Sequence, residues 1–115
     1  IRAALEQGLA QRDRAGGGFL QVSGLRLAYD PAAPAGSRVR SLAIGGAPVE
    51  AERRYTVAVV DYLLRGGDGL TAFGDARVLL DAVSGPLVAE VVTRAIERAG
   101  TIAPAVEGRI VTAGP

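Results

Sequence analysis

The fold class is decided by residues 25–49, which read LRLAYDPAAPAGSRVRSLAIGGAPV. Residues 25–29 alternate apolar with polar or small side chains, a pattern that predicts a half-buried strand. The proline- and glycine-containing segment that follows cannot continue a central strand, so it is a turn or loop. Arg38–Ile44 predicts a second strand, and Gly45-Gly46 predicts a tight hairpin after it. We therefore expect a β-meander across residues 19–50.

A helical pattern precedes this meander. Ile1, Leu5 and Leu9 recur at helical spacing, which predicts a helix over residues 1–12. The run Ala15-Gly16-Gly17-Gly18 must end this helix, and it leads directly into apolar residues. We expect it to form a sharp connector.

A second helix is predicted towards the C-terminus. Ser84-Gly85-Pro86 has the composition of a helix start, with the serine as cap and the proline in the first turn. Gly100 closes the helix. Between them lies a broad apolar stripe that comprises Leu87, Val88, Val91, Val92, Ala95, Ile96 and Ala99.

Three shorter segments complete the prediction. Tyr55–Val60 carries apolar residues at both odd- and even-numbered positions, which would point to opposite faces of a strand. This pattern predicts a strand covered on both faces. Residues 77–81 predict a short strand or turn, and Ile110-Val111 a final strand. The expected fold is α+β, with helices flanking a mostly antiparallel or mixed sheet.

Composition excludes several kinds of chemistry. The chain has no cysteine and no histidine, so it lacks a thiolate nucleophile, the usual general base and the commonest transition-metal ligand. The net charge is only +1 and the arginines are scattered along the sequence, so no basic patch for binding nucleic acid is indicated. No apolar run approaches the length of a membrane span. On its own, this chain is poorly equipped for hydrolysis.

The most informative loop is Tyr62–Gly69, which reads YLLRGGDG. Gly66 and Gly67 allow positive φ and a close approach to a ligand. The ring of Tyr62 and the carboxylate of Asp68 could grip a base and the neighbouring diol of a nucleoside. The purely structural alternatives are core packing for the ring and a turn-forming role for the aspartate. The loop lacks the Lys-Ser/Thr pair of a P-loop, so a phosphate-binding interpretation is weak.

Three further side chains could have either a functional or a purely structural role. Phe19 follows a glycine run and could supply a second stacking ring, but a lone phenylalanine is more often core. Asp61 could be a second polar group or simply a residue that ends a strand. Arg65 could face an anionic ligand or be a solvated surface arginine.

Taken in order, the motifs resemble the C-terminal domain of the 5′-nucleotidase family. The resemblance runs from residue 1 to about residue 112. It is carried by the segments Gly18–Gly24 (GFLQVSG), Tyr29-Asp30, Pro34–Val39 (PAGSRV), Tyr55–Ala58 (YTVA), Tyr62–Gly69 and Pro104–Ile110 (PAVEGRI).

The resemblance implies roles for individual residues. Members of the family are exported bacterial or cell-surface enzymes whose N-terminal domain carries two divalent metal ions and the hydrolytic chemistry. Their C-terminal domain binds the base and ribose of the nucleotide. Tyr62 then corresponds to a ring that stacks on the base, and Asp68 to the carboxylate that accepts hydrogen bonds from the ribose. Phe19 is the candidate for the second ring, although some relatives place that ring at the position of Val22.

We therefore expect a substrate-binding domain of a periplasmic or cell-surface 5′-nucleotidase-like hydrolase. No catalytic or metal-binding residue is assigned to this chain. Because the chain begins within a helical pattern, we expect residues 1–115 to be one domain that lacks its own N-terminal part and the metallophosphoesterase domain, and to be inactive alone. The alternatives are a relative acting on UDP-sugars, 2′,3′-cyclic nucleotides or sulfur intermediates, and a non-catalytic surface or interaction module.

Overall fold

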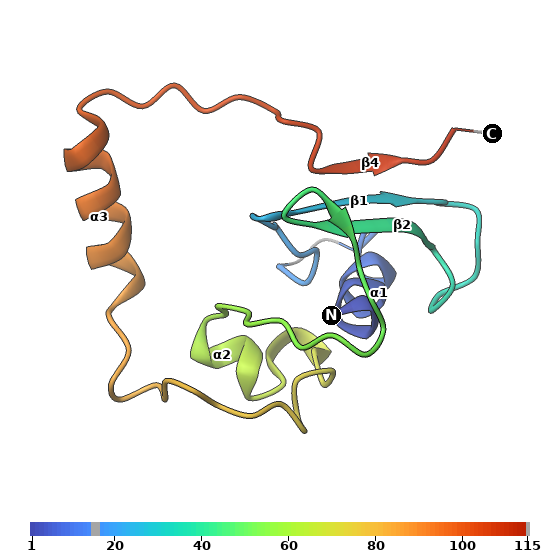
Figure 1. The fold of residues 1–115 in the computed structure, drawn as a ribbon, viewed down its shortest axis with the longest axis horizontal. Coiled ribbons are helices and arrows are strands. Elements are labelled where there is room, and N and C mark those ends of the chain that lie inside the picture. The colour runs from blue at the N-terminus through green and yellow to red at the C-terminus, as the bar shows by residue number, and fades with distance from the viewer. Residues whose placement is uncertain (15–16, 115) are drawn as a thin grey trace.

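The structure is a computed structural model that describes residues 1–14 and 17–114. The predicted connector at residues 15–18 therefore lies partly outside the described residues. Within these residues, eight elements follow one another: α1 (Arg2–Ala10), β1 (Leu25–Tyr29), β2 (Val39–Ile44), β3 (Ala47–Pro48), α2 (Asp61–Leu64), the 3-10 helix η1 (Gly67–Gly69), α3 (Val88–Ala99) and β4 (Ile110–Thr112). Figure 1 shows their arrangement.

The four strands form one mixed sheet in the order β3-β2-β1-β4. β2 pairs antiparallel with both β1 and β3, whereas β4 pairs parallel with β1. The hairpin between β2 and β3 turns at Gly45 and Gly46, whose φ angles of 59° and 85° suit a two-glycine turn. The predicted α+β class and the predicted hairpin are both confirmed.

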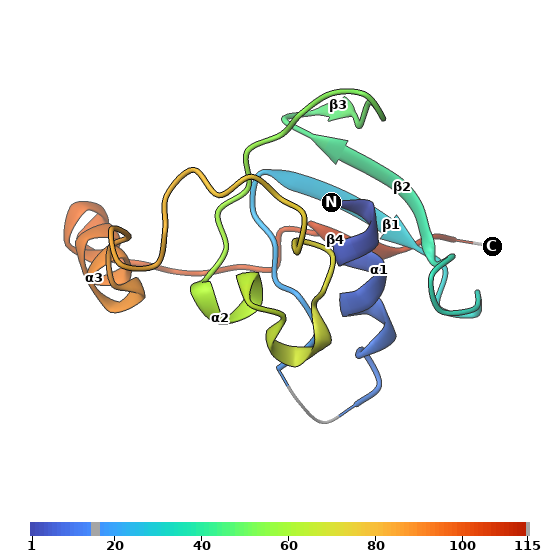
Figure 2. The same cartoon turned by 90° about the horizontal axis from the view of Figure 1, so that it is seen from below.

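One face of the sheet is covered by α1 (Figure 2). The helix directs Leu5 and Leu9, which lie one turn apart, onto the sheet. They meet the inward-facing side chains of β1 and β2 and form a single core cluster with Leu27, Tyr29, Val39 and Leu42. The predicted helix and both long strands therefore bury the expected apolar faces.

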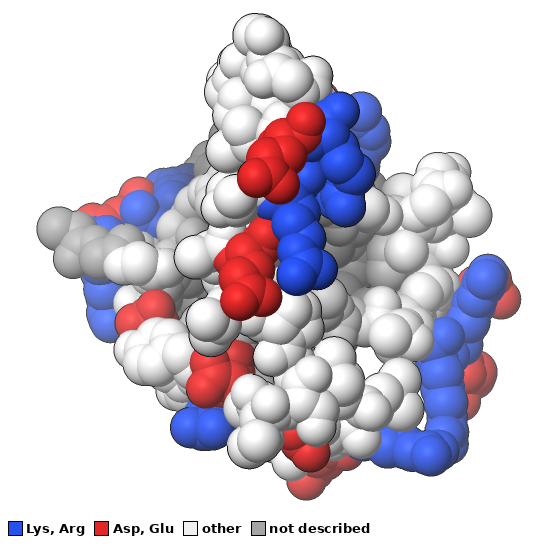
Figure 3. All heavy atoms as spheres, turned by 90° about the vertical axis from the view of Figure 1, so that its left-hand side faces the viewer, with Lys and Arg blue, Asp and Glu red and all other residues white. Residues whose placement is uncertain are grey.

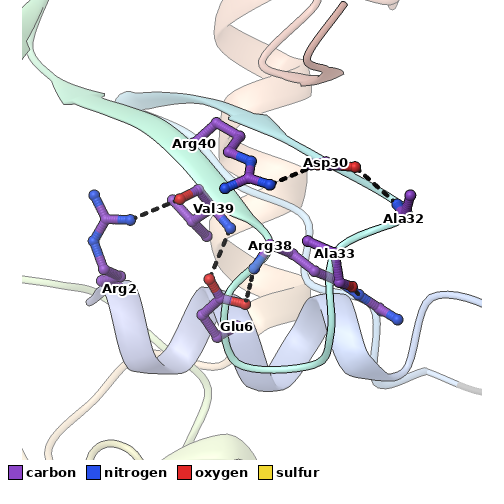
Figure 4. A network of polar contacts seen from close by, with 8 residues as sticks. All are labelled: Arg2, Glu6, Asp30, Ala32, Ala33, Arg38, Val39 and Arg40. Carbon is purple, nitrogen blue, oxygen red and sulfur yellow. Dashed lines mark hydrogen bonds and ion pairs between the residues drawn. The ribbon is translucent and has the colours of Figure 1, made fainter. Parts of the chain in front are cut away.

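A polar clamp fixes α1 to the start of β2 (Figure 4). The buried carboxylate of Glu6 accepts hydrogen bonds from the backbone N–H groups of Arg38, at 3.0 Å, and Val39, at 2.7 Å. The Arg38 side chain donates to the carbonyl oxygens of Leu9 and Ala33, at 2.6 and 3.1 Å. A buried carboxylate is costly unless it is hydrogen-bonded, and here both oxygens are. The clamp sets the position of the helix along the strand.

The strand predicted over Tyr55–Val60 is wrong. This segment is extended but pairs with no described strand, and Val57, Val59 and Val60 are exposed. An apolar run becomes a strand only where another strand can pair with its backbone, and the four-stranded sheet does not extend to this segment. Asp61 and Tyr62 consequently open the short helix α2 instead of ending a strand.

The second predicted helix exists but begins later than expected. Its N-cap is Leu87, and Ser84 instead donates its backbone N–H to Asp81 Oδ1 at 2.8 Å. Asp81 thus organises the preceding turn, so the prediction of Ser84 as the cap is wrong. Residues 77–81 contain neither the predicted strand nor a hydrogen-bonded turn; they are irregular, with a bend at Leu79 and Leu80. Gly100 closes the helix and the final strand is present as β4, as predicted.

The position of α3 differs from that of α1. It stands away from the sheet, joined to it by extended stretches (Figure 1), and none of its residues is buried. Its apolar stripe, including Val88, Val91, Val92 and Ile96, is exposed. On the side seen in Figure 3, acidic and basic side chains lie next to one another, without a patch of one sign.

Candidate functional site

The candidate site is built on the loop that joins α2 to η1. Gly66 takes a φ of 89° at the turn, and Asp68 takes a φ of 53° inside η1. Asp68 is the one non-glycine residue with positive φ in the part of the chain that the structure describes. Such a backbone conformation is strained and persists only where surrounding contacts hold it in place. It is often found at ligand sites.

This backbone brings the two predicted side chains together. The hydroxyl of Tyr62 donates to Asp68 Oδ1 at 3.1 Å, and it accepts from the backbone N–H of Asp68 at 3.2 Å. Both residues are exposed, with Tyr62 57% accessible. An aromatic ring and a carboxylate therefore lie side by side on the surface.

Gly67 seats the ring of Tyr62. A Cβ atom added to Gly67 would lie 2.6 Å from the ring Cζ, closer than van der Waals radii permit. The ring therefore packs against the Gly67 backbone at a distance that only glycine allows. Gly66 makes the turn, so the two predicted glycines have separate tasks.

The side chain of Gln7 holds the end of this loop against α1. The side-chain oxygen of Gln7 accepts hydrogen bonds from the backbone N–H groups of Thr71, at 3.1 Å, and Ala72, at 3.0 Å. Its side-chain nitrogen donates a hydrogen bond to the Thr71 hydroxyl at 2.7 Å. Leu70, immediately after η1, is 4% exposed and anchors the end of the loop. Nearby, a Cβ atom on Gly17 would lie 3.5 Å from Asp68 Oδ2. Gly17 thus lies beside the carboxylate.

Phe19 is placed differently from Tyr62. Its partly buried side chain packs against the core cluster, and it lines a small internal hollow together with Leu5, Leu9 and Ile110. Its role as a second stacking ring stays a prediction.

Asp61 and Arg65 pair with each other. Their charged groups lie 3.5 Å apart across one turn of α2, and both side chains are largely exposed. An exposed pair of this kind contributes little to stability. The pairing agrees with a surface role for Arg65, whereas Asp61 opens α2 and does not end a strand.

Comparisons with known proteins agree on one family. The family model described as "5′-nucleotidase, C-terminal domain" matches residues 1–75. A snake venom 5′-nucleotidase of Naja atra is 34% identical over 120 residues, which cover 96% of this chain. A 5′-nucleotidase of Bos taurus is 31% identical over 118 residues, again covering 96% of this chain.

The chain belongs to the family of 5′-nucleotidase C-terminal domains.

A solved structure confirms the fold of this 5′-nucleotidase C-terminal domain. The crystal structure of a 5′-nucleotidase precursor from Thermus thermophilus matches with a TM-score of 0.85 and 37% identity. The match covers 98% of this chain and 23% of that one. The chain likewise spans 22% of the Naja atra relative and 20% of the Bos taurus relative, so it corresponds to about a fifth of these enzymes.

Neither a metal-ligand cluster nor a membrane span is found in the described part of this 5′-nucleotidase C-terminal domain. Within residues 1–14 and 17–114, no three acidic side chains gather closely enough to hold a metal ion. Over the same residues, no helix has both the length and the apolar character needed to cross a membrane.

Gln7 belongs to the site region although nothing in the sequence pattern indicated it. Gln7 lies 64 positions before Thr71 and on an amphipathic helix that has no motif of its own. Only a three-dimensional arrangement shows that this glutamine supports the loop that carries Tyr62 and Asp68.

Proposed function

We propose that this domain binds the base and ribose of a nucleotide or nucleoside, within a 5′-nucleotidase-like phosphoester hydrolase. The observation that supports it is the contact between Tyr62 and Asp68 on one exposed loop. Stacking of a base on an aromatic ring is worth about 1–3 kcal/mol and tolerates different bases. A carboxylate beside the ring accepts charge-assisted hydrogen bonds from sugar hydroxyls.

Each of the five residues has a part in this proposal. Tyr62 supplies the stacking ring, Asp68 the sugar contact, Gly67 the seat of the ring and Gly66 the turn that aligns them. Phe19 is proposed as the second ring. For that role a face of Phe19 must reach the ligand although the side chain also packs against the core cluster.

Hydrolysis is assigned elsewhere in the polypeptide. We propose that two divalent metal ions in a separate metallophosphoesterase domain activate the attacking water, while this domain positions the substrate. The isolated 115-residue chain would then bind ligand without turnover. We also propose an exported enzyme, located in the periplasm or at the cell surface.

The apolar stripe of α3 supports the proposal that the domain works inside a longer polypeptide. Four large apolar side chains of this helix are exposed: Val88, Val91, Val92 and Ile96. Contiguous apolar surface of this kind marks an interaction site. The occupant we propose is another part of the same polypeptide, because the matched relatives are about five times as long as this chain.

A titration of adenosine and of AMP into the intact protein tests the binding site. Tyr62→Ala and Asp68→Ala should each weaken binding by about tenfold or more, which corresponds to the loss of one stacking contact or one charge-assisted bond. Asp75→Ala is the matched control, because Asp75 is an exposed loop aspartate with no hydrogen bond among the described residues. Affinities that are unchanged in both site variants would contradict the proposal.

A substrate panel on the same intact protein separates the alternatives. Turnover of UDP-sugars, 2′,3′-cyclic nucleotides or sulfur intermediates in preference to AMP would assign the domain to a relative with another substrate. The exposed stripe of α3 also fits a non-catalytic interaction module. Absence of both nucleoside binding and metal-dependent turnover in the intact protein would favour that module.

A further inference from the structure

The hydroxyl of Tyr62 makes two hydrogen bonds to the same residue. It donates to Asp68 Oδ1 at 3.1 Å and accepts from the Asp68 backbone N–H at 3.2 Å. The ring alone is enough for stacking on a base, and a phenylalanine at this position would offer the same ring without either bond. The hydroxyl therefore has a separate task, and the residue that it contacts indicates what that task is.

We propose, on the basis of the function proposed above, that the Tyr62 hydroxyl is a positioning group for Asp68. It holds the Asp68 backbone in the left-handed conformation and thereby fixes the direction of the carboxylate before a ligand arrives. Tyr62 then serves the site twice, because its ring meets the base and its hydroxyl prepares the group that meets the sugar.

The backbone of Asp68 needs such support. Its φ of 53° lies in the left-handed region, which a residue with a side chain rarely adopts. The neighbouring positions with positive φ are Gly66, at 89°, and Gly69, at 75°. Both are glycines, for which this conformation has no steric cost. Asp68 is therefore the residue of this turn that must be held in its conformation by contacts.

The two hydrogen bonds restrain this conformation because they lie on opposite sides of one rotatable bond. The angle φ is the rotation about the N–Cα bond, which separates the N–H group of Asp68 from its side chain. A change in φ moves the carboxylate relative to the N–H, so one hydroxyl oxygen keeps both bonds only over a narrow range of φ. The N–H groups of Gly69 and Leu70, by contrast, donate to carbonyl oxygens of the turn itself.

The hydroxyl is itself held in place by the packing of its ring. A Cβ atom added to Gly67 would lie 2.6 Å from Cζ of Tyr62, the ring carbon that carries the hydroxyl. The ring therefore rests directly on the Gly67 backbone and cannot swing towards it. The hydroxyl is a fixed point to which Asp68 is bonded.

The phenol orients the carboxylate without blocking it. Each carboxylate oxygen can accept more than one hydrogen bond, so both Oδ1 and Oδ2 of Asp68 remain able to accept from sugar hydroxyls. A group that is ordered before binding loses less entropy when the ligand arrives, which raises affinity without a new contact. A phenylalanine at position 62 would leave that ordering to the ligand, and affinity would fall.

A double-mutant cycle tests this assignment by titration of adenosine into the intact protein. Tyr62→Phe should weaken binding by about fivefold or more, because the ring stays while the restraint on Asp68 is lost. In the Asp68→Ala background the same change should alter affinity by less than about twofold, since the carboxylate that the hydroxyl positions is absent. An unaltered affinity in Tyr62→Phe would overturn the inference. Equal losses in the two backgrounds would overturn it too, because the hydroxyl would then act on the ligand without Asp68.

Amide hydrogen exchange in the ligand-free protein gives a second readout. Exchange of the Asp68 N–H, measured by NMR, should be faster in Tyr62→Phe, because that N–H loses its acceptor. Tyr55→Phe is the matched control, since the Tyr55 hydroxyl accepts a hydrogen bond from the Glu50 backbone N–H at 3.1 Å. That variant should speed exchange at Glu50 and leave both the Asp68 exchange and the affinity for adenosine unchanged.

The outcomes separate this inference from the proposed function. Unchanged exchange at Asp68 in Tyr62→Phe would overturn the inference and leave the proposed function standing. Failure of the intact protein to bind adenosine would overturn the proposed function, and the role of the hydroxyl in binding with it.

Discussion

The side chains of Gln7 and Thr71 are joined by a hydrogen bond of 2.7 Å across 64 positions of sequence. Gln7 also accepts hydrogen bonds from the backbone N–H groups of Thr71 and Ala72. Together these three bonds connect α1 to the end of the Tyr62–Asp68 loop. The same helix is fixed to β2 through Glu6. The position of the loop relative to the sheet therefore depends on two adjacent side chains of α1.

Gln7→Ala should release this loop. Loss of three hydrogen bonds should lower the free energy of unfolding by about 1–2 kcal/mol and weaken adenosine binding, because the strained backbone at Asp68 loses part of its support. Urea denaturation and titration measure the two effects.

A conservative variant makes this prediction specific. In Gln7→Glu the carboxylate can still accept both backbone N–H groups, and the Thr71 hydroxyl can donate to it, so loop and affinity should be retained. Gln21→Ala, at an exposed glutamine, should have no effect. Equal losses in Gln7→Ala and Gln7→Glu would contradict the assigned role.

Glu6→Ala should destabilise the whole domain. It leaves the buried N–H group of Val39 and the partly buried N–H group of Arg38 without their acceptor, at a cost of about 2–4 kcal/mol in the free energy of unfolding. Thermal and urea unfolding measure this loss. Glu52→Ala, which removes an exposed carboxylate, should be neutral, and similar stabilities for the two variants would contradict the proposed clamp.

Gly67→Ala tests the seat of the Tyr62 ring in isolation from backbone strain. Gly67 does not have positive φ, and the three atoms nearest to an added methyl group all belong to the Tyr62 ring. We expect nucleoside affinity to fall about tenfold or more as the ring is displaced, which corresponds to most of one stacking contact. Gly74→Ala is the control, since a Cβ atom there meets only a carbonyl oxygen at 3.4 Å. Equal affinities for the two variants would argue against stacking on Tyr62.

The carboxylate of Asp30 should make stability depend on pH in the acidic range. A hydrogen bond from the Arg40 side chain, and then one from the Ala32 backbone N–H, lower the pKa of Asp30 below its ordinary value of 3.8. A lowered pKa in the folded state means that the stabilisation is present above 3.8 and is lost as the pH falls through the folded pKa.

Comparison with Asp30→Asn isolates this contribution. The pKa values of Asp13, through Arg12, and of Asp81, through the Ser84 N–H, are also lowered, so the pH profile of the unsubstituted protein alone combines several groups. Asp30→Asn should be the less stable protein at neutral pH, and the difference should shrink below pH 3.8. Urea unfolding at a series of pH values measures it, and a difference that stays constant far below that pH would contradict the assignment.

The helix α3 should depend on the rest of the polypeptide for its order. It has 12 residues and buries none of them, and an isolated helix of this length is marginal in water. Amide hydrogen exchange over residues 88–99 should be fast in the 115-residue chain and strongly slowed in the intact protein. Equal exchange in both would show that no further segment covers the apolar stripe.

The sequence predicted the elements whose signals are local. Period-2 alternation located β1, helical spacing located α1, and Gly45-Gly46 located the hairpin, because each depends on neighbouring residues alone. The contact between Tyr62 and Asp68 could also be predicted from the sequence, since the two residues are six positions apart on a glycine turn. Their assignment to base and sugar came from the family resemblance and stays a prediction.

The failures have a common physical origin. The apolar run at Tyr55–Val60 has the composition of a buried strand, but no neighbouring strand is available to pair with it. The contact from Gln7 to Thr71 and the parallel pairing of β4 with β1 both join residues that are far apart in sequence. No local pattern reports such contacts, so only the assembled chain shows them.

The parallel pairing of β4 with β1 gives the segment between β3 and β4 two fixed ends on the same sheet. Along it lie the Tyr62–Asp68 loop and then α3, separated by extended backbone (Figure 1). The length of that backbone sets how far the Tyr62–Asp68 loop and α3 can lie from each other. A change in that length would alter their spacing without altering the pairing of the central strands.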